Sequence, residues 1–273
     1  MMRSYFTSLI CQIICFFIIL HGCVKTITKG EIRRNLIDVL NNINTYSYEM
    51  EMCMETSIAG EDSTEIVKSN GNGYIDIKNK KMKISINLNE TDKEKSRLTQ
   101  TEIYIFDTME YIQSGKNNEW IKFEVPRHKL DNENQLKKQM KLVMISKIKN
   151  LKEETFKNID CYLLSIEPDK QSFWKVIMEQ DEEHPLFKLF NLDYESVVKC
   201  TDMKVWIEKN SFIPMKCVMQ MRAVIEKQIM KHPFKMIINI KKGYSYYNYN
   251  TPLVIKLPDQ AKSAKVYQEE WED

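Results

Sequence analysis

The sequence predicts an α+β protein in which a curved antiparallel β-sheet, an unclosed barrel of about ten strands, carries helices on its concave face. Three observations lead to this prediction. Apolar and polar residues alternate with a period of two over most of the chain, the helical period occurs in few segments, and no break in composition divides the 273 residues. A half-polar sheet of this size must bury its apolar face, and so few helices can cover it only if it curves around them.

The chain begins with a short apolar leader. Arg3 precedes an uncharged run from about Phe6 to Leu20, which at ~1.5 Å per residue spans ~22 Å and is short for a bilayer core of ~30 Å. Such a run is typical of a signal peptide. It ends in Leu20-His21-Gly22-Cys23, which resembles the lipobox of prokaryotic lipoproteins, although His21 departs from that pattern. We therefore predict a signal peptide over residues 1–22 and lipid attachment at Cys23. The alternative is an uncleaved anchor helix.

Both interpretations place the rest of the chain outside the cytoplasm, on the surface of the cell membrane. Residues 23–28 are then the lipidated cysteine and a short linker, and residues 29–273 a single domain. An extracytoplasmic location permits disulfides, and four further cysteines allow three pairings that the sequence does not rank. These cysteines are Cys53, Cys161, Cys200 and Cys217.

Three segments have the helical period, one at the start of the domain and two in its middle. Thr28 and Glu31 form a capping box before the first, in which Ile32, Leu36 and Ile43 belong to one apolar stripe. We predict the second over about Asn132–Leu151. The third begins at a cap on Asp169 and runs through Ile177, and Leu186–Phe190 adds a turn or two.

Strand patterns begin directly after the first helix, where Tyr46–Met54 alternate with polar residues. Lys78–Lys81 and Glu208–Ser211 are predicted hairpin connections, and Gly71-Asn72-Gly73 a bulge or turn that enters a strand. The other predicted strands are Ile75–Ile77, Met82–Leu88, Thr101–Phe106, Glu110–Gln113, Trp120–Val125, Cys161–Ile166, Met203–Ile207, Met215–Met221, Phe234–Ile240 and Val254–Leu257.

The apolar positions of these strands supply the candidate ligand site. If the helices do not fill the concave side, these positions line an apolar cavity; if they do, the same stripes are packed core, and the sequence leaves both possibilities open. Methionine occurs 16 times, and its flexible thioether suits adaptable apolar surfaces. The candidate cavity residues are Tyr48, Met50, Met52, Ile84, Ile86, Met219, Met221, Met236 and Ile238.

Several stretches together resemble the LolA/LppX-like superfamily of prokaryotic lipoproteins and lipoprotein carriers. They are the leader with Cys23, the end of the first helix at Asn44–Tyr48, and the segments Gly115–Lys122, Val205–Pro214 and Tyr246–Ala261. The resemblance implies an unclosed β-barrel lidded by helices, which in characterised members holds acyl chains or lipids. It implies no catalytic residues.

Motifs of enzymes and nucleic-acid binders are missing from the sequence. With 40 Lys+Arg against 38 Asp+Glu, the chain lacks the basic excess of a nucleic-acid-binding protein. No nucleophile elbow, phosphate-binding loop or dinucleotide fingerprint occurs. Asp181-Glu182-Glu183-His184 offers cation ligands but lacks a second histidine at ligand spacing, and we interpret it as a solvated acidic loop. We therefore predict no catalytic residue, no metal and no cofactor.

The expected function is that of a membrane-anchored extracytoplasmic lipoprotein. Its partner is the membrane, through Cys23, and its concave face binds or carries a lipid or acyl chain without catalysis. The main alternative is a structural or envelope-interaction lipoprotein with a filled core and no ligand. A hydrolase with a convergent Ser or Cys, His and carboxylate is a third.

Overall fold

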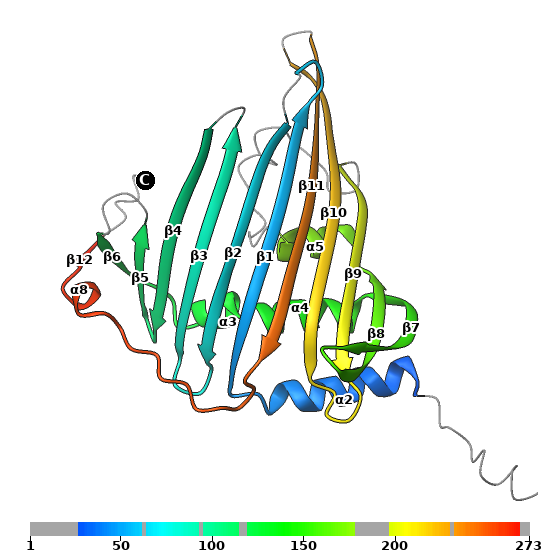
Figure 1. Cartoon of the computed structure of the whole chain (residues 1–273), viewed down its shortest axis with the longest axis vertical. Coiled ribbons are helices and arrows are strands. Elements are labelled where there is room, and N and C mark those ends of the chain that lie inside the picture. Colours follow the sequence, from blue (N-terminus) through cyan, green and yellow to red (C-terminus); the bar gives the residue numbers. More distant parts are fainter. Residues whose placement is uncertain are drawn as a thin grey trace, which may run out of the picture.

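The computed structural model describes residues 27–61, 64–92, 95–114, 119–177, 197–229 and 232–267. The leader with Cys23, the acidic loop at Asp181–His184 and the segment Leu186–Phe190 lie outside these ranges. The described residues form one sheet with twelve strands (Figure 1), which are β1 (Thr45–Ile58), β2 (Thr64–Asp76), β3 (Lys81–Asp92), β4 (Lys95–Phe106), β5 (Met109–Ser114), β6 (Trp120–Glu124), β7 (Lys147–Phe156), β8 (Ile159–Glu167), β9 (Val198–Glu208), β10 (Pro214–Ile229), β11 (His232–Tyr247) and β12 (Lys265–Val266).

The sheet consists of two meanders that meet at its centre. Its strand order is β12-β6-β5-β4-β3-β2-β1-β11-β10-β9-β8-β7, so β1 pairs with β11 and the two meanders run outward from that pair. All pairs are antiparallel except the short parallel pair β12–β6. The two outer strands, β12 and β7, end the sheet at opposite sides, and the sheet is curved and unclosed, as predicted.

This topology determines where the helices lie. Because β6 and β7 stand near opposite edges, the chain between them must cross the sheet, and α3 and α4 make that crossing behind the strands in Figure 1. Five helices are described in all, and they are α2 (Lys29–Asn41), α3 (Lys129–Glu133), α4 (Gln135–Ile145), α5 (Lys170–Ile177) and α8 (Asp259–Lys262).

The helix caps follow from local sequence. Both hydrogen bonds of the predicted capping box are present, with the Glu31 N–H donating to Thr28 Oγ1 and the Thr28 N–H to Glu31 Oε2. Asn134 caps α4 by accepting from the Lys137 N–H at 3.0 Å. Asp169 caps α5 by accepting from the Ser172 N–H at 2.9 Å, which confirms the predicted start of that helix.

One predicted helix is wrong in its bounds, and one predicted strand is absent. The helix predicted over Asn132–Leu151 ends at Ile145, because Ser146 has extended dihedrals (φ −91°, ψ 162°) and the chain continues as β7. There Ile148 pairs with Ile166 of β8, a contact distant in sequence. Residues Val254–Leu257 form no strand; they belong to the connection that runs along the strand ends from β11 to α8 (Figure 1).

The glycine segment of β2 also differs from its prediction. Gly71-Asn72-Gly73 continues the strand without a register shift on either side, so it is neither a bulge nor a turn. Gly73 is needed because the Tyr48 ring of β1 lies directly over it: a Cβ there would lie 2.2 Å from the ring. The glycine gives this large aromatic side chain room within the core.

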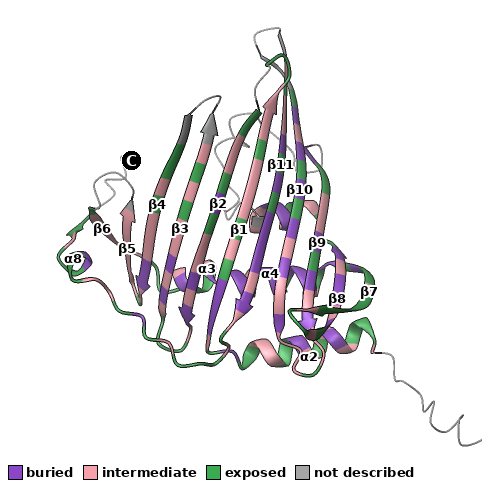
Figure 2. Ribbon diagram, in the orientation of Figure 1, coloured by how far each residue is buried: buried purple, intermediate pink, exposed green. Residues whose placement is uncertain are grey.

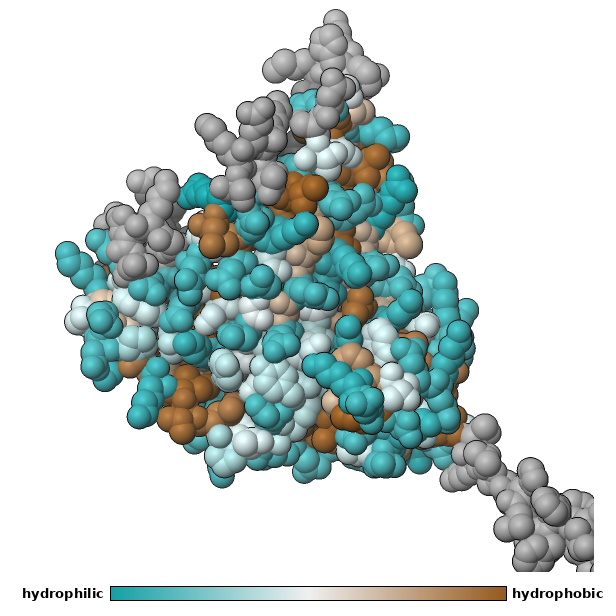
Figure 3. Space-filling view, viewed as in Figure 1, coloured by the Kyte–Doolittle hydropathy of each residue, from teal (hydrophilic) through white to brown (hydrophobic). Residues whose placement is uncertain are grey.

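Buried residues gather on one face of the sheet. In β1 to β4, Figure 2 shows them concentrated toward the strand ends that α3 and α4 cross, whereas in β10 and β11 they continue farther along the strands. Figure 3 shows the face turned away from these helices, which is mainly hydrophilic with separate apolar spots. The concave face is therefore the apolar one.

Candidate functional site

All nine candidate cavity residues lie on the concave face. Register pairs join them across the sheet: Tyr48 faces Gly73 of β2, which faces Ile84 of β3, and Met52 faces Lys242 of β11, which faces Met219 of β10. Five of the nine are buried in the core, namely Tyr48, Ile84, Met219, Met221 and Ile238, and four are half-buried, namely Met50, Met52, Ile86 and Met236.

Methionines are concentrated in the middle of this face. Three neighbouring positions each on β1, β11 and β10 form three cross-strand rows. The rows are Met50–Tyr244–Cys217, Met52–Lys242–Met219 and Met54–Ile240–Met221. We call their five methionines, Met50, Met52, Met54, Met219 and Met221, the methionine patch.

Lys242 lies at the centre of the methionine patch and was not among the predicted site residues. It is 5% exposed, and its Nζ lies 5.6 Å from the centre of the Tyr244 ring. The eight neighbouring positions on its face carry the five methionines of the patch, Ile240, Cys217 and Tyr244. The sequence does hold a signal for it: from Met236 to Tyr246 the concave positions of β11 are otherwise apolar.

Tyrosines fix α4 to the sheet beside the patch. The Tyr46 hydroxyl donates to Asn134 Oδ1 at 2.8 Å, and the Tyr246 hydroxyl donates to Gln139 Oε1 at 2.6 Å. Tyr46 and Tyr246 stand on β1 and β11 with their rings 6.0 Å apart, and burial raises the pKa of both hydroxyls well above the ordinary value. Tyr244 stacks on Tyr246 at 6.1 Å. This end of the concave face is packed core.

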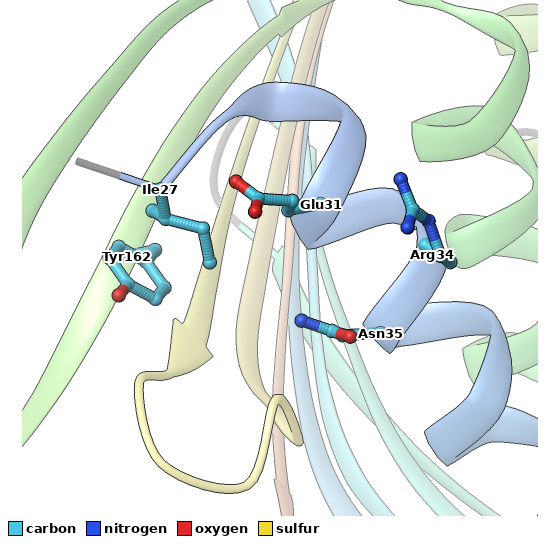
Figure 4. A pocket seen from close by; sticks show the side chains of 5 residues that line it. All are labelled: Ile27, Glu31, Arg34, Asn35 and Tyr162. Atoms are coloured by element: carbon cyan, nitrogen blue, oxygen red, sulfur yellow. The ribbon is translucent and has the colours of Figure 1, made fainter. Parts of the chain in front are cut away.

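Three hollows lie elsewhere on the described surface. One of about 350 Å³ lies beside the start of α2 and is lined by Ile27, Glu31, Arg34 and Asn35, with Tyr162 of β8 next to Ile27 (Figure 4). The other two, of about 500 and 550 Å³, lie over β1, β2 and β3 and are lined by both polar and apolar residues. Glu51, Asn70 and Asn87 line both, and Met52 lines the first and Met50 the second.

The described part of the chain holds no group of side chains suited to a metal ion. Its four cysteines are free thiols, and burial raises the pKa of Cys217 far above the usual range, which makes it a poor nucleophile. Over the same residues, no helix is both long and apolar enough to cross a membrane.

The comparisons with known proteins identify the family. A model of a family of unknown function, DUF6612, matches residues 28–266. The chain belongs to the DUF6612 family. The match covers all twelve strands of the sheet and every helix that the structure describes. No curated protein matches the chain.

Solved structures show only distant likenesses. A DUF1329 family protein from Desulfovibrio piger is 11% identical, with 83% of this chain and 93% of that chain covered, at a TM-score of 0.25. Lipovitellin is 6% identical, with 78% of this chain and 26% of that chain covered, at 0.36. A DUF1849 protein from Brucella abortus is 8% identical, with 76% and 100% covered, at 0.25. These TM-scores are low, so the likenesses do not bear on what this chain binds.

The two buried tyrosines, Tyr46 and Tyr246, which we call the tyrosine anchors, predict how the free energy of unfolding depends on pH. Because burial raises the pKa of Tyr46 and Tyr246, both stay protonated in the folded state while the unfolded chain ionises above pH ~10. Their stabilisation is complete below pH ~10 and is lost as the pH rises toward their folded pKa, by about 1.4 kcal/mol per pH unit for each tyrosine. We expect Tyr246→Phe to remove one of these two contributions to the alkaline slope in urea unfolding.

At neutral pH the same variant loses the hydrogen bond to Gln139, and we expect the free energy of unfolding to fall by about 1–3 kcal/mol. Tyr247→Phe is the matched control, because Tyr247 is the next residue of β11 and lies on the other face. It should change stability at neutral pH by less than about 0.5 kcal/mol. Equal losses in the two variants, or an unchanged alkaline slope in Tyr246→Phe, would contradict the proposed anchor.

Proposed function

We propose that this protein is a lipid-anchored extracytoplasmic lipoprotein that binds or carries a lipid or acyl chain, without catalysis, on the concave face of its sheet. The proposal agrees with the resemblance of the sequence to the LolA/LppX-like lipoproteins. It is the same function that the leader and the strand patterns predict.

One observation carries the proposal: the apolar concave face is only half-buried where β1 extends beyond the tyrosine anchors. Met50, Met52 and Met54 follow one another on that face and are all intermediate in exposure. From Met50 to Met54 the strand rises ~14 Å at ~3.4 Å per residue. A row of flexible thioethers of this length offers an alkyl chain continuous apolar contact.

The packing also supports this function over that of a filled structural core. Near α4 the concave face is fully packed, and the buried Tyr46 and Tyr246 leave no place there for a ligand. On β1 and β3 the side chains of Met52 and Ile86 remain half-buried. A ligand that covered them would gain about 25 cal/mol for each Å² of apolar surface removed from water.

A chain-length series of neutral alcohols tests apolar binding without any charge. We expect 1-dodecanol to bind the purified full chain about fifteenfold more tightly than 1-decanol in titration calorimetry, because each buried methylene contributes about 0.8 kcal/mol. The double variant Met50→Ala/Met52→Ala should weaken both alcohols. Its control is Glu49→Ala/Glu51→Ala, which alters exposed residues of β1 that alternate with these methionines on the opposite face.

Two results would defeat apolar binding on this face. One is an absence of binding by either alcohol, which would favour a structural or envelope-interaction lipoprotein. The other is an equal loss of affinity in the methionine and glutamate double variants.

Membrane attachment is tested at Cys23. We expect Cys23→Ser to remove incorporated palmitate and to shift the protein from the membrane fraction to the soluble fraction, because stable anchoring needs the covalently attached chains. Cys53→Ser, at a free thiol in β1, should leave both unchanged. If the intact mass of the unaltered protein retains residues 1–22, the leader is an anchor helix instead.

A further inference from the structure

The hollow of about 550 Å³ lies on the face of the sheet opposite to the methionine patch, the face seen in Figure 3. Register pairs place its polar side chains in two adjacent rows across β1, β2 and β3, and none of them is buried. Met50 lies between these rows along β1 and faces the other way. We call the two rows the polar floor, and they are Glu49–Asn72–Ser85 and Glu51–Asn70–Asn87.

The asparagines of the polar floor are poor choices for a strand that only needs a solvated face. Asn70, Asn72 and Asn87 occupy the middle of two neighbouring strands. Asparagine is depleted in strands, because its short amide competes for backbone hydrogen bonds. The side chains are aligned across the strands, since Asn87 Nδ2 donates to Asn70 Oδ1 at 3.1 Å. Residues that break a local preference within a regular element are expected mainly at functional sites.

The end of β7 forms a wall of this hollow. Phe156 and Lys157 line the hollow together with Lys216 of β10, and Figure 1 shows this end of β7 in front of β9. The Phe156 ring lies 6.3 Å from the ring of Trp206, and Lys216 Nζ lies 5.3 Å from the centre of the Phe156 ring. Trp206 Nε1 in turn donates to Glu154 Oε1 at 3.2 Å. The wall is therefore built from packed aromatic and basic side chains.

Gly243 of β11 makes room beside the polar floor. A Cβ at this position would lie 3.0 Å from Glu51 Oε1, so the glycine allows the Glu51 carboxylate to lie close to β11. The hollow of about 500 Å³ shares Glu51, Asn70 and Asn87 with the first. The two hollows therefore adjoin, and together they form one groove.

The groups of this groove suit a neutral ligand with many hydroxyls. Carboxylates accept hydrogen bonds and amides both donate and accept them, which matches sugar hydroxyls, since these do both as well. The carboxylates of Glu49 and Glu51 disfavour an anion, and the ammonium groups of Lys157 and Lys216 disfavour a cation. The ring of Phe156 offers apolar contact to the C–H groups of a sugar. Polar groups beside an aromatic side chain are typical of small-molecule sites.

We propose that this groove binds a neutral oligosaccharide chain, with its hydroxyls on the polar floor and a sugar ring against Phe156. From Lys216 on β10 to Ser85 on β3 the groove crosses β11, β1 and β2, which is ~19 Å at ~4.8 Å between strands and holds several sugar units. The inference goes beyond the proposed function, because it uses the opposite face of β1.

The test is a calorimetric titration of the full chain with two neutral β-1,4-linked tetrasaccharides, cellotetraose and the N-acetylglucosamine tetramer. We expect at least one of them to bind, about tenfold or more tightly than its disaccharide, because the longer chain contacts more of the polar floor. Its affinity should be the same at low and high salt, since the ligand carries no charge.

The double variant Glu49→Ala/Asn72→Ala removes one register pair of the polar floor and should lower the affinity for the tetrasaccharide about tenfold or more. Glu55→Ala/Asn239→Ala is the matched control. It removes a register pair of the same two residue types, with the same change of charge, from exposed positions of the same face beyond both hollows. The control should leave the affinity unchanged, and both variants should keep the urea midpoint of the unaltered chain.

Three results would overturn the oligosaccharide site. They are an absence of binding by both tetrasaccharides, equal losses in the two double variants, and tighter binding of spermine or inorganic phosphate, which would show a site for a charged ligand. Titration with 1-dodecanol separates this inference from the proposed function. Glu49→Ala/Asn72→Ala should leave the affinity for the alcohol unchanged, and a failure of the alcohol to bind defeats the proposed function while the oligosaccharide site stands.

Discussion

The structure depends on the crossing of the sheet between β6 and β7. Two meanders joined at β1 and β11 leave these strands near opposite edges, so the chain must pass over the concave face, and it does so as α3 and α4. The hydroxyls of Tyr46 and Tyr246, which hydrogen-bond to Asn134 and Gln139, hold this crossing in place. Because a buried hydroxyl without a partner is costly, these hydrogen bonds fix the position of α4 along the strands.

The position of α4 divides the concave face into two regions with different properties. Beneath α4 the tyrosines and isoleucines are packed to full burial. Farther along the strands, the methionine patch combines flexible side chains with partial exposure on β1 and a buried cation at Lys242. Of the two possibilities that the sequence leaves open, packed core describes the buried residues of this stripe, and cavity lining remains our proposal for the half-buried ones.

Much of the fold could be predicted from local patterns, because alternation fixes the faces of a strand and capping residues fix helix starts. Thr28, Glu31 and Asp169 did so correctly. Elements that depend on distant partners could not be predicted. Ile148 and Leu151 continue the apolar stripe of the preceding helix, yet they pair with β8. Val254–Leu257 alternate like a strand, but they lie along the strand ends and pair with no strand.

Lys242 was not predicted because a charged residue interrupts the apolar pattern of its strand. Only the register of β1, β11 and β10 shows that methionines surround it.

The central claim is that the half-buried methionines of β1 form the contact surface for an alkyl chain. Its most direct test is a methyl NMR spectrum of the full chain labelled at its 16 methionines, with and without dodecanoate. The account predicts that the methyl signals of Met50, Met52 and Met54 shift, while that of Met109, on the other face at β5, does not. Shifts at Met109 with unchanged signals from the three β1 methionines would contradict it.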